Sequence, residues 1–267
     1  METEISLKSL IHSTVMKEER KPYRGIHPSS LGGCPRTHYW KIKGILPTTP
    51  PGIGELMNFK MGDAWENALF PILQRLDGIK VHHHKGEKAW SVPELNLFGT
   101  PDYTITVDGK NLIVDAKTVK SKWFDYVERE YKTVQDTVDK NTFLLEKNHH
   151  YAIQQGAYLL MAKRLGLEYD HAKLIFVSKD NSFIGWEVEI YLTEELEKEI
   201  LERIEYLNNC LNFDKLPKCE CEDWKVGYCD FGVVETQTEN RTHKMVNTEC
   251  CNEEYVINYN KILKGEN

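Results

Sequence analysis

The sequence predicts an α/β fold with a mixed central sheet that is flanked by helices. Segments with helical and strand periodicity follow each other in the order helix, three strands, two helices, two strands, helix. A hairpin signal, Asp108-Gly109, lies between two runs of β-branched and apolar residues, which predicts antiparallel neighbours within that sheet. The 267 residues suffice for one large domain or a domain with a satellite.

The composition is that of an ordinary globular chain, with 40% hydrophobic and 28% charged residues. The first residues lack the apolar run of a signal peptide, and no stretch approaches the ~20 apolar residues that a membrane-spanning helix needs. A net charge of −7 argues against nonspecific coating of nucleic acid but is compatible with a local basic groove. We therefore expect a cytoplasmic protein.

The first quarter of the chain is predicted to contain helices joined by a turn-rich segment. Residues 1–20 predict a short polar helix and residues 37–42 a second one. Between them, a segment rich in turn-forming residues holds Cys34. A core helix is predicted over residues 55–76, where apolar residues recur at helical spacing and only Pro71 interrupts the pattern.

Residues 79–90 predict a strand that contains three consecutive histidines, His82, His83 and His84. Alternation places His82 and His84 on one face of this strand. Two imidazoles could bind a metal, but no nearby cysteine or acidic residue completes a site. A structural role is therefore favoured for all three.

The hairpin at Asp108-Gly109 determines which residues lie opposite each other. Pairing across a two-residue turn makes opposed residue numbers sum to 217, so Asp102 is expected opposite Asp115. Alternation then puts Asp102, Asp115 and Lys117 on one face. Two carboxylates with Cβ atoms only ~5 Å apart repel each other unless a cation lies between them. A divalent ion is one explanation, and the solvated outer face of an ordinary hairpin is the other.

The second half of the chain has clear helix and strand signals. Helices are predicted over 122–131 and 149–165, strands over 172–178 and 183–191, and a helix from an N-cap at Thr193 to Cys210. Beyond residue 229 the sequence is polar and is predicted to be irregular.

Four motifs, in this order along the chain, resemble those of the PD-(D/E)XK nuclease superfamily. They are Gly62-Asp-Ala-Trp-Glu66, Gly99-Thr-Pro-Asp102, Val114-Asp115-Ala116-Lys117 and Gln154-Gln-Gly-Ala-Tyr158, of which the last is similar to the Q-x-x-x-Y motif of the RecB-like branch. Many RecB-like members have His where this chain has Glu66. The resemblance implies a restriction-endonuclease-like core whose mixed sheet carries the active site.

The resemblance also implies a Mg²⁺ or Mn²⁺ site whose ligands are Glu66, Asp102, Asp115 and the carbonyl of Ala116. Such an all-oxygen set is the one that hard divalent cations prefer. Lys117 would hold the nucleophilic water or stabilise the charge that develops on the phosphorus-bound oxygens. Gln154 and Tyr158, one helical turn apart, would position substrate and Lys117. Core packing explains Tyr158 equally well.

The seven cysteines suggest a second metal site. Clustered cysteines in a reducing compartment point to metal before disulfides. One early cysteine and three after the last core helix resemble the [4Fe–4S] staple of RecB-like, AddB-like and CRISPR-adaptation nucleases: Cys34, Cys219, Cys221 and Cys229. Four thiolates also suit structural zinc, and free thiols are the third reading. Cys210, Cys250 and Cys251 are predicted to be bystanders.

Basic and aromatic residues lie at the end of the second hairpin strand and just after it: Lys117, Lys120, Lys122, Trp123, Phe124 and Tyr126. Basic groups for phosphates and aromatic faces for bases are the ingredients of a groove for single-stranded DNA. A solvated lysine run before an amphipathic helix explains the same residues.

The resemblance divides the chain into an N-terminal helical segment (1–54), a nuclease core (55–210), a cysteine motif (211–230) and a C-terminal extension of unknown role (231–267). It implies a metal-dependent DNA exonuclease that acts on ends or single strands in recombination, repair or replication, in a bacterium or phage-infected cell. A helicase or recombination protein is the expected partner. The alternative is a nuclease-fold module that binds DNA or a helicase without cutting.

Overall fold

The computed structural model describes Thr14 and residues 22–49, 51–84, 89–180, 184–221, 229–239, 242–249 and 252–264. The predicted helix over 1–20 therefore lies, but for Thr14, outside the described residues, as do Cys250 and Cys251. Internal contacts divide the chain into two compact units. The larger consists of Arg24–Gly33 and Met61–Leu216, and the smaller of Met1–Tyr23, Cys34–Lys60 and Pro217–Asn267. The borders of the larger unit thus differ from the expected 55–210.

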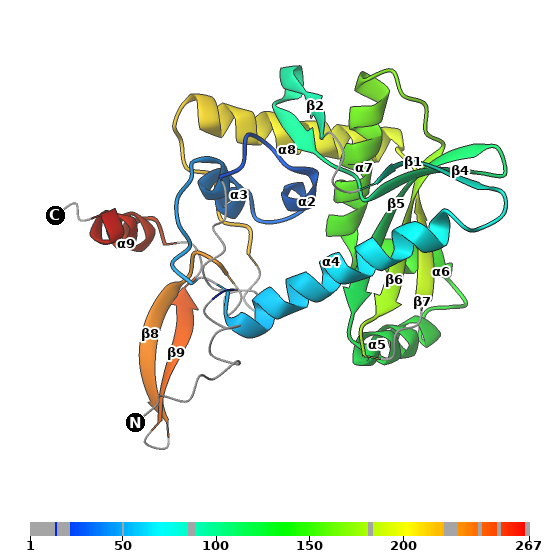
Figure 1. The fold of residues 1–267 in the computed structure, drawn as a ribbon. Helices are drawn as coiled ribbons and strands as arrows, with labels where there is room; N and C mark the ends of the chain where they lie inside the picture. Colours follow the sequence, from blue (N-terminus) through cyan, green and yellow to red (C-terminus); the bar gives the residue numbers. More distant parts are fainter. Residues whose placement is uncertain are drawn as a thin grey trace, which may run out of the picture. The chain divides into compact units, whose positions relative to one another are not determined.

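The larger unit is built on a five-stranded mixed sheet (Figure 1). In spatial order the strands are β1 (Ile79–His84), β4 (Tyr103–Val107), β5 (Lys110–Val119), β6 (His171–Ser178) and β7 (Ile184–Ile190). The β5 and β6 strands run parallel, and the other neighbours run antiparallel. The α/β class and the mixed sheet are therefore confirmed.

The β4–β5 hairpin has the predicted register. Its ladder runs from the pair Tyr103 and Val114 to the pair Val107 and Lys110. The turn residues Asp108 and Gly109 have φ angles of 50° and 76°, the positive values that a type I′ turn requires. Beyond Val114, β5 continues for five residues whose ladder partners are on β6 alone. The last five residues of β5 therefore extend past the end of β4.

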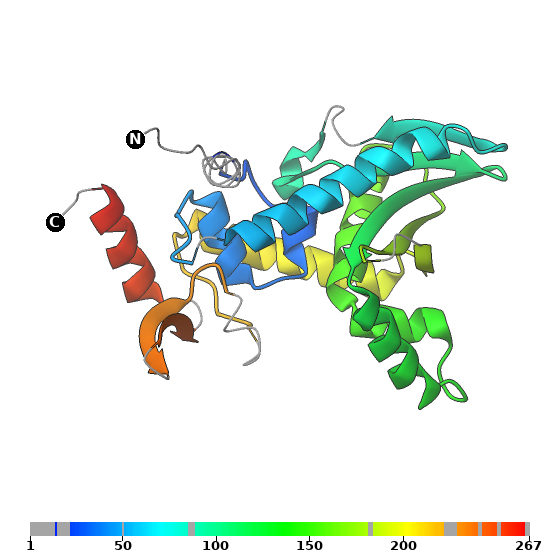
Figure 2. The same cartoon turned by 60° about the horizontal axis from the view of Figure 1, so that its bottom comes forward.

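Helices cover both faces of the sheet, and Figures 1 and 2 show α4 (Ile53–Leu73) crossing one of them. The apolar core on this face includes Leu69, Tyr103, Ile105, Leu112, Val114, Ala116, Ile175 and Val177. The opposite face lies under α7 (His149–Arg164), in which residues 152–162 are all buried. Ile113 and Asp115 on that face are 0% and 2% exposed. The hairpin face that carries Asp115 is therefore buried, and the solvated-face explanation is wrong.

Side-chain hydrogen bonds to backbone N–H groups mark the start of three further helices of this unit. The hydroxyl of Thr193 accepts a hydrogen bond from Leu196 N at 3.2 Å and starts α8 (Glu194–Asn212), as predicted. The carboxylate of Asp180 accepts from Ser121 N at 2.6 Å and starts α5 (Ser121–Lys132) directly after β5. A further short helix, α6 (Lys140–Lys147), was not expected; Asp139 caps it by accepting from Thr142 N at 3.0 Å.

The predicted strand over 79–90 is two strands. One is β1, and the other, β2 (Trp90–Val92), pairs with β3 (Leu97–Gly99) in a separate two-stranded sheet. A short 3₁₀ helix, η1 (Pro93–Leu95), joins β2 to β3. A Cβ on Gly99 would lie 2.8 Å from Pro28 Cδ of α2 (Pro28–Leu31) and 3.0 Å from Tyr158 Cε1. Glycine is thus required where the chain passes α7 just before Asp102.

The smaller unit joins distant parts of the sequence. It contains α3 (Pro35–Ile42), the first residues of α4, the two-stranded sheet of β8 (Val233–Glu239) and β9 (Thr242–Glu249), and α9 (Glu253–Lys264). Asn260 on α9 exchanges two hydrogen bonds with the backbone of Leu46, at 2.9 and 3.0 Å. The Trp40 and Phe231 rings pack with centroids 4.8 Å apart. The prediction of an irregular C-terminal region was therefore wrong.

None of the helices within the described part of the chain combines the length and apolar character needed to cross a membrane.

Candidate functional site

Asp102 and Asp115 meet at the open end of the β4–β5 hairpin. Asp102 directly precedes the first ladder residue of β4, and Asp115 directly follows that residue's partner on β5. One oxygen of each carboxylate, Asp102 Oδ2 and Asp115 Oδ1, is buried and accepts no hydrogen bond from an N–H or hydroxyl group of the described residues. A buried carboxylate oxygen without a partner is costly. These two oxygens are therefore suited to bind a cation.

The charges around Asp102 and Asp115 also favour a bound cation. The pKa of Asp102 lies well above its usual range, first because the carboxyl is buried and then because Asp115 and Glu66 add negative charge beside it. Lys117 opposes this shift without cancelling it. Without a cation, burial and the neighbouring charges thus favour the protonated form of Asp102, which can hydrogen-bond to the Asp115 carboxylate. A divalent ion would relieve the same repulsion.

Lys117 lies beside the carboxylates, as the hairpin face predicts. Its Nζ is 2.8 Å from Asp115 Oδ2, and its side chain is 21% exposed, so that it can also be reached from solvent. Burial alone would lower the pKa of Lys117, but the charges of Asp115 and Asp102 more than offset this and raise it. The ammonium therefore stays protonated. It also lies over the ring of Tyr151, 5.3 Å from the centroid.

Gln154 and Tyr158 of α7 both reach the site, although their contacts differ from those expected. Gln154 Nε2 donates to Asp115 Oδ2 at 3.1 Å. Tyr158 Oη donates to the carbonyl of Thr100 at 2.9 Å, two residues before Asp102. The two side chains thus hold the carboxylate-bearing segments and not Lys117.

Gln155 is a site residue that the sequence analysis missed. Its Nε2 also donates to Asp115 Oδ2. The available signal was a second amide inside an otherwise mostly apolar, buried helical segment. Only the docking of α7 on the sheet shows that both neighbouring amides turn toward one carboxylate.

Glu66 and Ala116 are less closely tied to the site. Glu66 lies on α4, where its backbone carbonyl accepts a hydrogen bond from Tyr103 Oη, and its charge contributes to the raised pKa of Asp102. Among the residues searched, however, its carboxylate does not form a three-ligand group within 4.8 Å together with Asp102 and Asp115. The Ala116 side chain packs on the α4 face. The role of its carbonyl stays a prediction.

His82 and His83 are not part of a metal-binding group within the described residues, and the side chain of His84 lies outside them. His82 Nε2 lies 2.6 Å from the hydroxyl of Thr106, with which it shares a hydrogen bond. His83 is buried, and its ring centroid is 6.3 Å from that of Trp90. Both contacts agree with the structural role that we favoured.

Three of the four predicted cysteine ligands come together in the smaller unit. The Sγ atoms of Cys34, Cys219 and Cys221 all lie within 4.8 Å of one another, and those of Cys34 and Cys219 are 4.0 Å apart. Arg36 Nε donates to the carbonyl of Pro217 at 2.7 Å, which ties the two segments together. We call these three cysteines the cysteine group. They could hold a thiophilic metal.

The other cysteines have different positions. Cys229 is buried in the smaller unit but is not part of the cysteine group. Cys210 is buried on α8 in the larger unit. A fourth ligand from Cys229 is therefore still a prediction.

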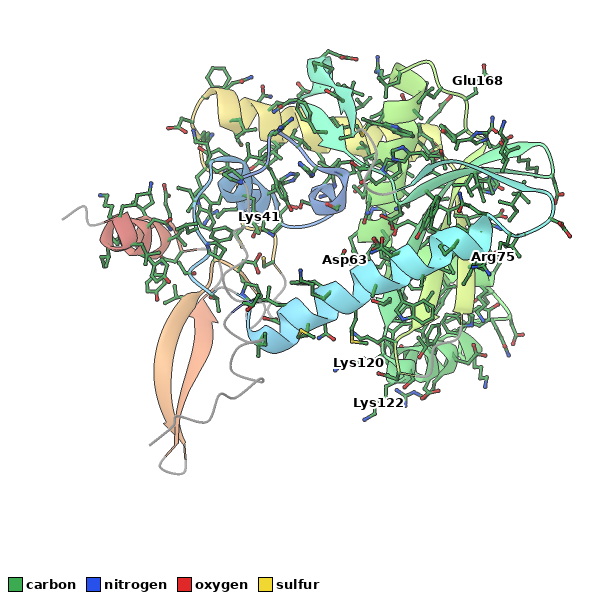
Figure 3. All side chains as sticks on the ribbon, in the orientation of Figure 1. Lys41, Asp63, Arg75, Lys120, Lys122 and Glu168 are labelled. Carbon is green, nitrogen blue, oxygen red and sulfur yellow. The ribbon has the colours of Figure 1, made fainter. Side chains whose placement is uncertain are left out.

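The basic and aromatic run is only partly suited to a groove. Phe124 is buried, and Trp123 stacks on Phe176 with ring centroids 4.6 Å apart, so these aromatic faces belong to the packing. Phe124 is therefore not free to stack on a base, whereas Tyr126, the third aromatic residue of the run, is 45% exposed. Lys120 and Lys122, in contrast, are exposed around the start of α5 (Figure 3). They are two exposed positive charges where β5 passes into α5.

No protein-family model and no curated protein matches this chain. Among solved structures, the crystal structure of SSO0001 is similar to it with a TM-score of 0.48 and 17% sequence identity, over 84% of this chain and 93% of that chain.

Proposed function

We propose that this protein is a Mg²⁺- or Mn²⁺-dependent deoxyribonuclease of the PD-(D/E)XK type, acting as an exonuclease on DNA ends or single strands. The observation that carries the proposal is a pair of buried oxygens, Asp102 Oδ2 and Asp115 Oδ1, that accept no hydrogen bond from an N–H or hydroxyl donor of the described residues and lie near the ammonium of Lys117. The four motifs supply the class of reaction, because two acidic residues and a lysine in this order resemble the signature of these nucleases.

The donor set fits a hard divalent cation. Asp102 and Asp115 would hold the ion, with Glu66 and the carbonyl of Ala116 as further oxygen ligands. When bound, such an ion polarises a phosphodiester oxygen and lowers the pKa of a water molecule. The thiolates of the cysteine group would not compete for it, since sulfur ligands select softer metals.

Lys117 has a separate task in this proposal. One of its three N–H groups is directed at Asp115 Oδ2, and the others can donate to the attacking water or to a phosphate oxygen whose negative charge grows. Because its pKa is raised, it donates hydrogen bonds throughout and does not act as a base. Tyr158 maintains the approach of Asp102 by fixing the carbonyl of Thr100.

DNA is the substrate that the surroundings favour. Lys120 and Lys122 follow the active-site strand and give local positive charge to a chain whose net charge is −7. The remaining parts of the proposal come from the resemblance. They are a [4Fe–4S] cluster, with zinc as the alternative, on Cys34, Cys219, Cys221 and Cys229, a helicase or recombination partner, and a bacterial or phage-infected cytoplasm.

The test uses purified full-length protein with end-labelled linear DNA and covalently closed double-stranded DNA, with Mg²⁺ or Mn²⁺ or with EDTA. Linear DNA should be degraded only with the cation, and the closed circle should be spared. Asp115→Asn should lower the rate by more than about 100-fold, and Asp125→Asn, at an exposed position on α5, should leave it unchanged.

Three outcomes would speak against the proposal. Cleavage that survives EDTA or the Asp115→Asn change would contradict the assigned site. Rapid nicking of the closed circle would indicate an endonuclease. DNA binding without any cleavage would favour the non-cutting nuclease-fold module.

A further inference from the structure

Three N–H donors converge on one oxygen of Asp115, and none reaches the other. Lys117 Nζ lies 2.8 Å from Oδ2, Gln154 Nε2 lies 3.1 Å from it, and Gln155 Nε2 donates to the same atom. Oδ1 is buried and accepts no hydrogen bond from any N–H or hydroxyl group in the described part of the chain. The carboxylate is therefore strongly asymmetric. A group that approaches it can use Oδ1 alone, because Oδ2 is occupied by donors.

We propose that Gln155 is a positioning residue that locks the Asp115 carboxylate and so keeps Oδ1 free for a divalent cation. The inference rests on the proposed function in one respect, which is that the ligand of the site is a hard cation. Gln155 itself does not touch the cation or the substrate. It acts through the orientation of Asp115.

The burial of Gln155 argues that its amide is not there for packing. The side chain is 0% exposed, and its neighbours along α7 within residues 152–162 are all buried too. Its Oε1 is buried and has no hydrogen-bond partner among the described residues. Methionine has a similar length and would fill the same space without an unpaired polar atom. The amide is thus costly for the fold, and its one hydrogen bond is made to the carboxylate.

The geometry explains why one amide does not suffice. A carboxylate can turn about its Cβ–Cγ bond, and a turn exchanges its two oxygens. Lys117 reaches Oδ2 from the same strand as Asp115, whereas Gln154 and Gln155 come from α7 and leave the helix axis about 100° apart. Donors from the strand and from two directions on the helix fix the plane of the carboxylate. Without Gln155, the remaining donors leave more freedom to turn.

The test measures Mn²⁺ binding to the full-length protein by titration calorimetry and by the electron paramagnetic resonance signal of free Mn²⁺. Gln155→Met should weaken binding by about 10- to 100-fold, as is typical when a side chain that orients a metal ligand is lost. The melting temperature of the protein without added divalent cation should stay near that of the wild type. Gln135→Met, an exposed amide in the loop after α5, is the matched control and should bind Mn²⁺ normally.

A purely structural role for Gln155 would change the melting temperature and leave the affinity of the folded protein intact. Wild-type Mn²⁺ affinity in Gln155→Met would therefore overturn the inference. Should that variant fail to fold, Gln155→Ala gives the same test with a smaller side chain. It should lose affinity to the same degree.

The same measurements separate this inference from the nuclease proposal. If the wild type binds Mn²⁺ but does not cut DNA, and Gln155→Met binds more weakly, the nuclease proposal fails and the role of Gln155 stands. If both proteins bind Mn²⁺ and cut DNA equally well, the role of Gln155 fails and the nuclease proposal stands. A wild type that does not bind Mn²⁺ would overturn both.

Discussion

The carboxylate site and the cysteine group both gather metal-binding side chains, but the chain assembles them in different ways. Asp102 and Asp115 belong to one hairpin, and a two-residue turn determines their approach. Cys34 and Cys219 are 185 residues apart in sequence and meet only because the smaller unit closes on itself. The first site follows from local pairing, and the second depends on tertiary structure.

This difference has a consequence for stability. The carboxylates raise the cost of folding, because two acidic groups are buried together. A metal held by the cysteine group would instead cross-link distant segments and reduce the entropy of the unfolded chain. We therefore expect changes at the cysteines to act mainly on stability and changes at the carboxylates to act mainly on cation binding.

The largest expected effect on stability is that of Cys34→Ala. A cross-link that closes a loop of this length contributes about 5 kcal/mol in the chain-entropy model. Its loss should lower the melting temperature by roughly 10–20 °C, which differential scanning calorimetry would detect. The metal content of the purified variant should fall as well. Mn²⁺ binding at the carboxylates should survive below the transition.

Cys221→Ala should behave like Cys34→Ala, and Cys250→Ala should be mild. A Cys34→Ala protein with unchanged metal content and melting temperature would remove the distinction between the two sites. In that case, the cysteine group would be three thiols that happen to lie close together.

Asp102→Asn should have a smaller effect on stability, and the size of this effect depends on pH. The folded protein holds the Asp102 proton more tightly than the unfolded chain does, because the folded pKa is raised. Stability is therefore lost as pH rises from about 4, the ordinary pKa of aspartate, through the raised value. Asparagine does not titrate. Without added cation, the variant should thus be more stable than the wild type above about pH 4, by a margin that grows with pH. Below pH 4 the two proteins should be about equally stable.

Melting temperatures of both proteins across pH 4 to 8 would check this. Added Mn²⁺ should raise the melting temperature of the wild type and have little effect on Asp102→Asn. A difference between the two proteins that stays constant with pH would contradict the account of the buried pair.

The smallest effect is expected for Tyr158→Phe. The change removes the hydrogen bond to the carbonyl of Thr100 and keeps the ring, at a cost of about 1 kcal/mol. Mn²⁺ affinity should fall several-fold, since the segment that leads to Asp102 is held less firmly. Unchanged affinity and stability would show that Tyr158 serves only in packing. Its ring does lie close to Gly99.

Much of the larger unit could be predicted because its signals are local. The Asp108-Gly109 turn fixed the register of β4 and β5, and Thr193 marked the start of α8. The short helix α6 and the β8–β9 hairpin were missed. Their sequences are polar, and neither has a hydrophobic period long enough to distinguish it from a loop.

The site, too, could be predicted only where it depends on local pairing. The meeting of Asp102 and Asp115 follows from register, which a single turn determines. The contact of Gln155 with Asp115 depends on how α7 docks on the sheet, and no periodicity in the sequence contains that information. The failure of Phe124 as a platform for bases has a similar cause, since tertiary packing buries it.

The most direct test of the central claim is a crystal structure of the protein soaked in Mn²⁺, with anomalous diffraction recorded to locate the ion. We expect an ion bound by Asp102 Oδ2 and Asp115 Oδ1, the two oxygens that accept no hydrogen bond from an N–H or hydroxyl group of the described residues, while Asp115 Oδ2 keeps its three donors. An ion bound through Asp115 Oδ2, or no ion at this pair in a crystal saturated with Mn²⁺, would contradict it.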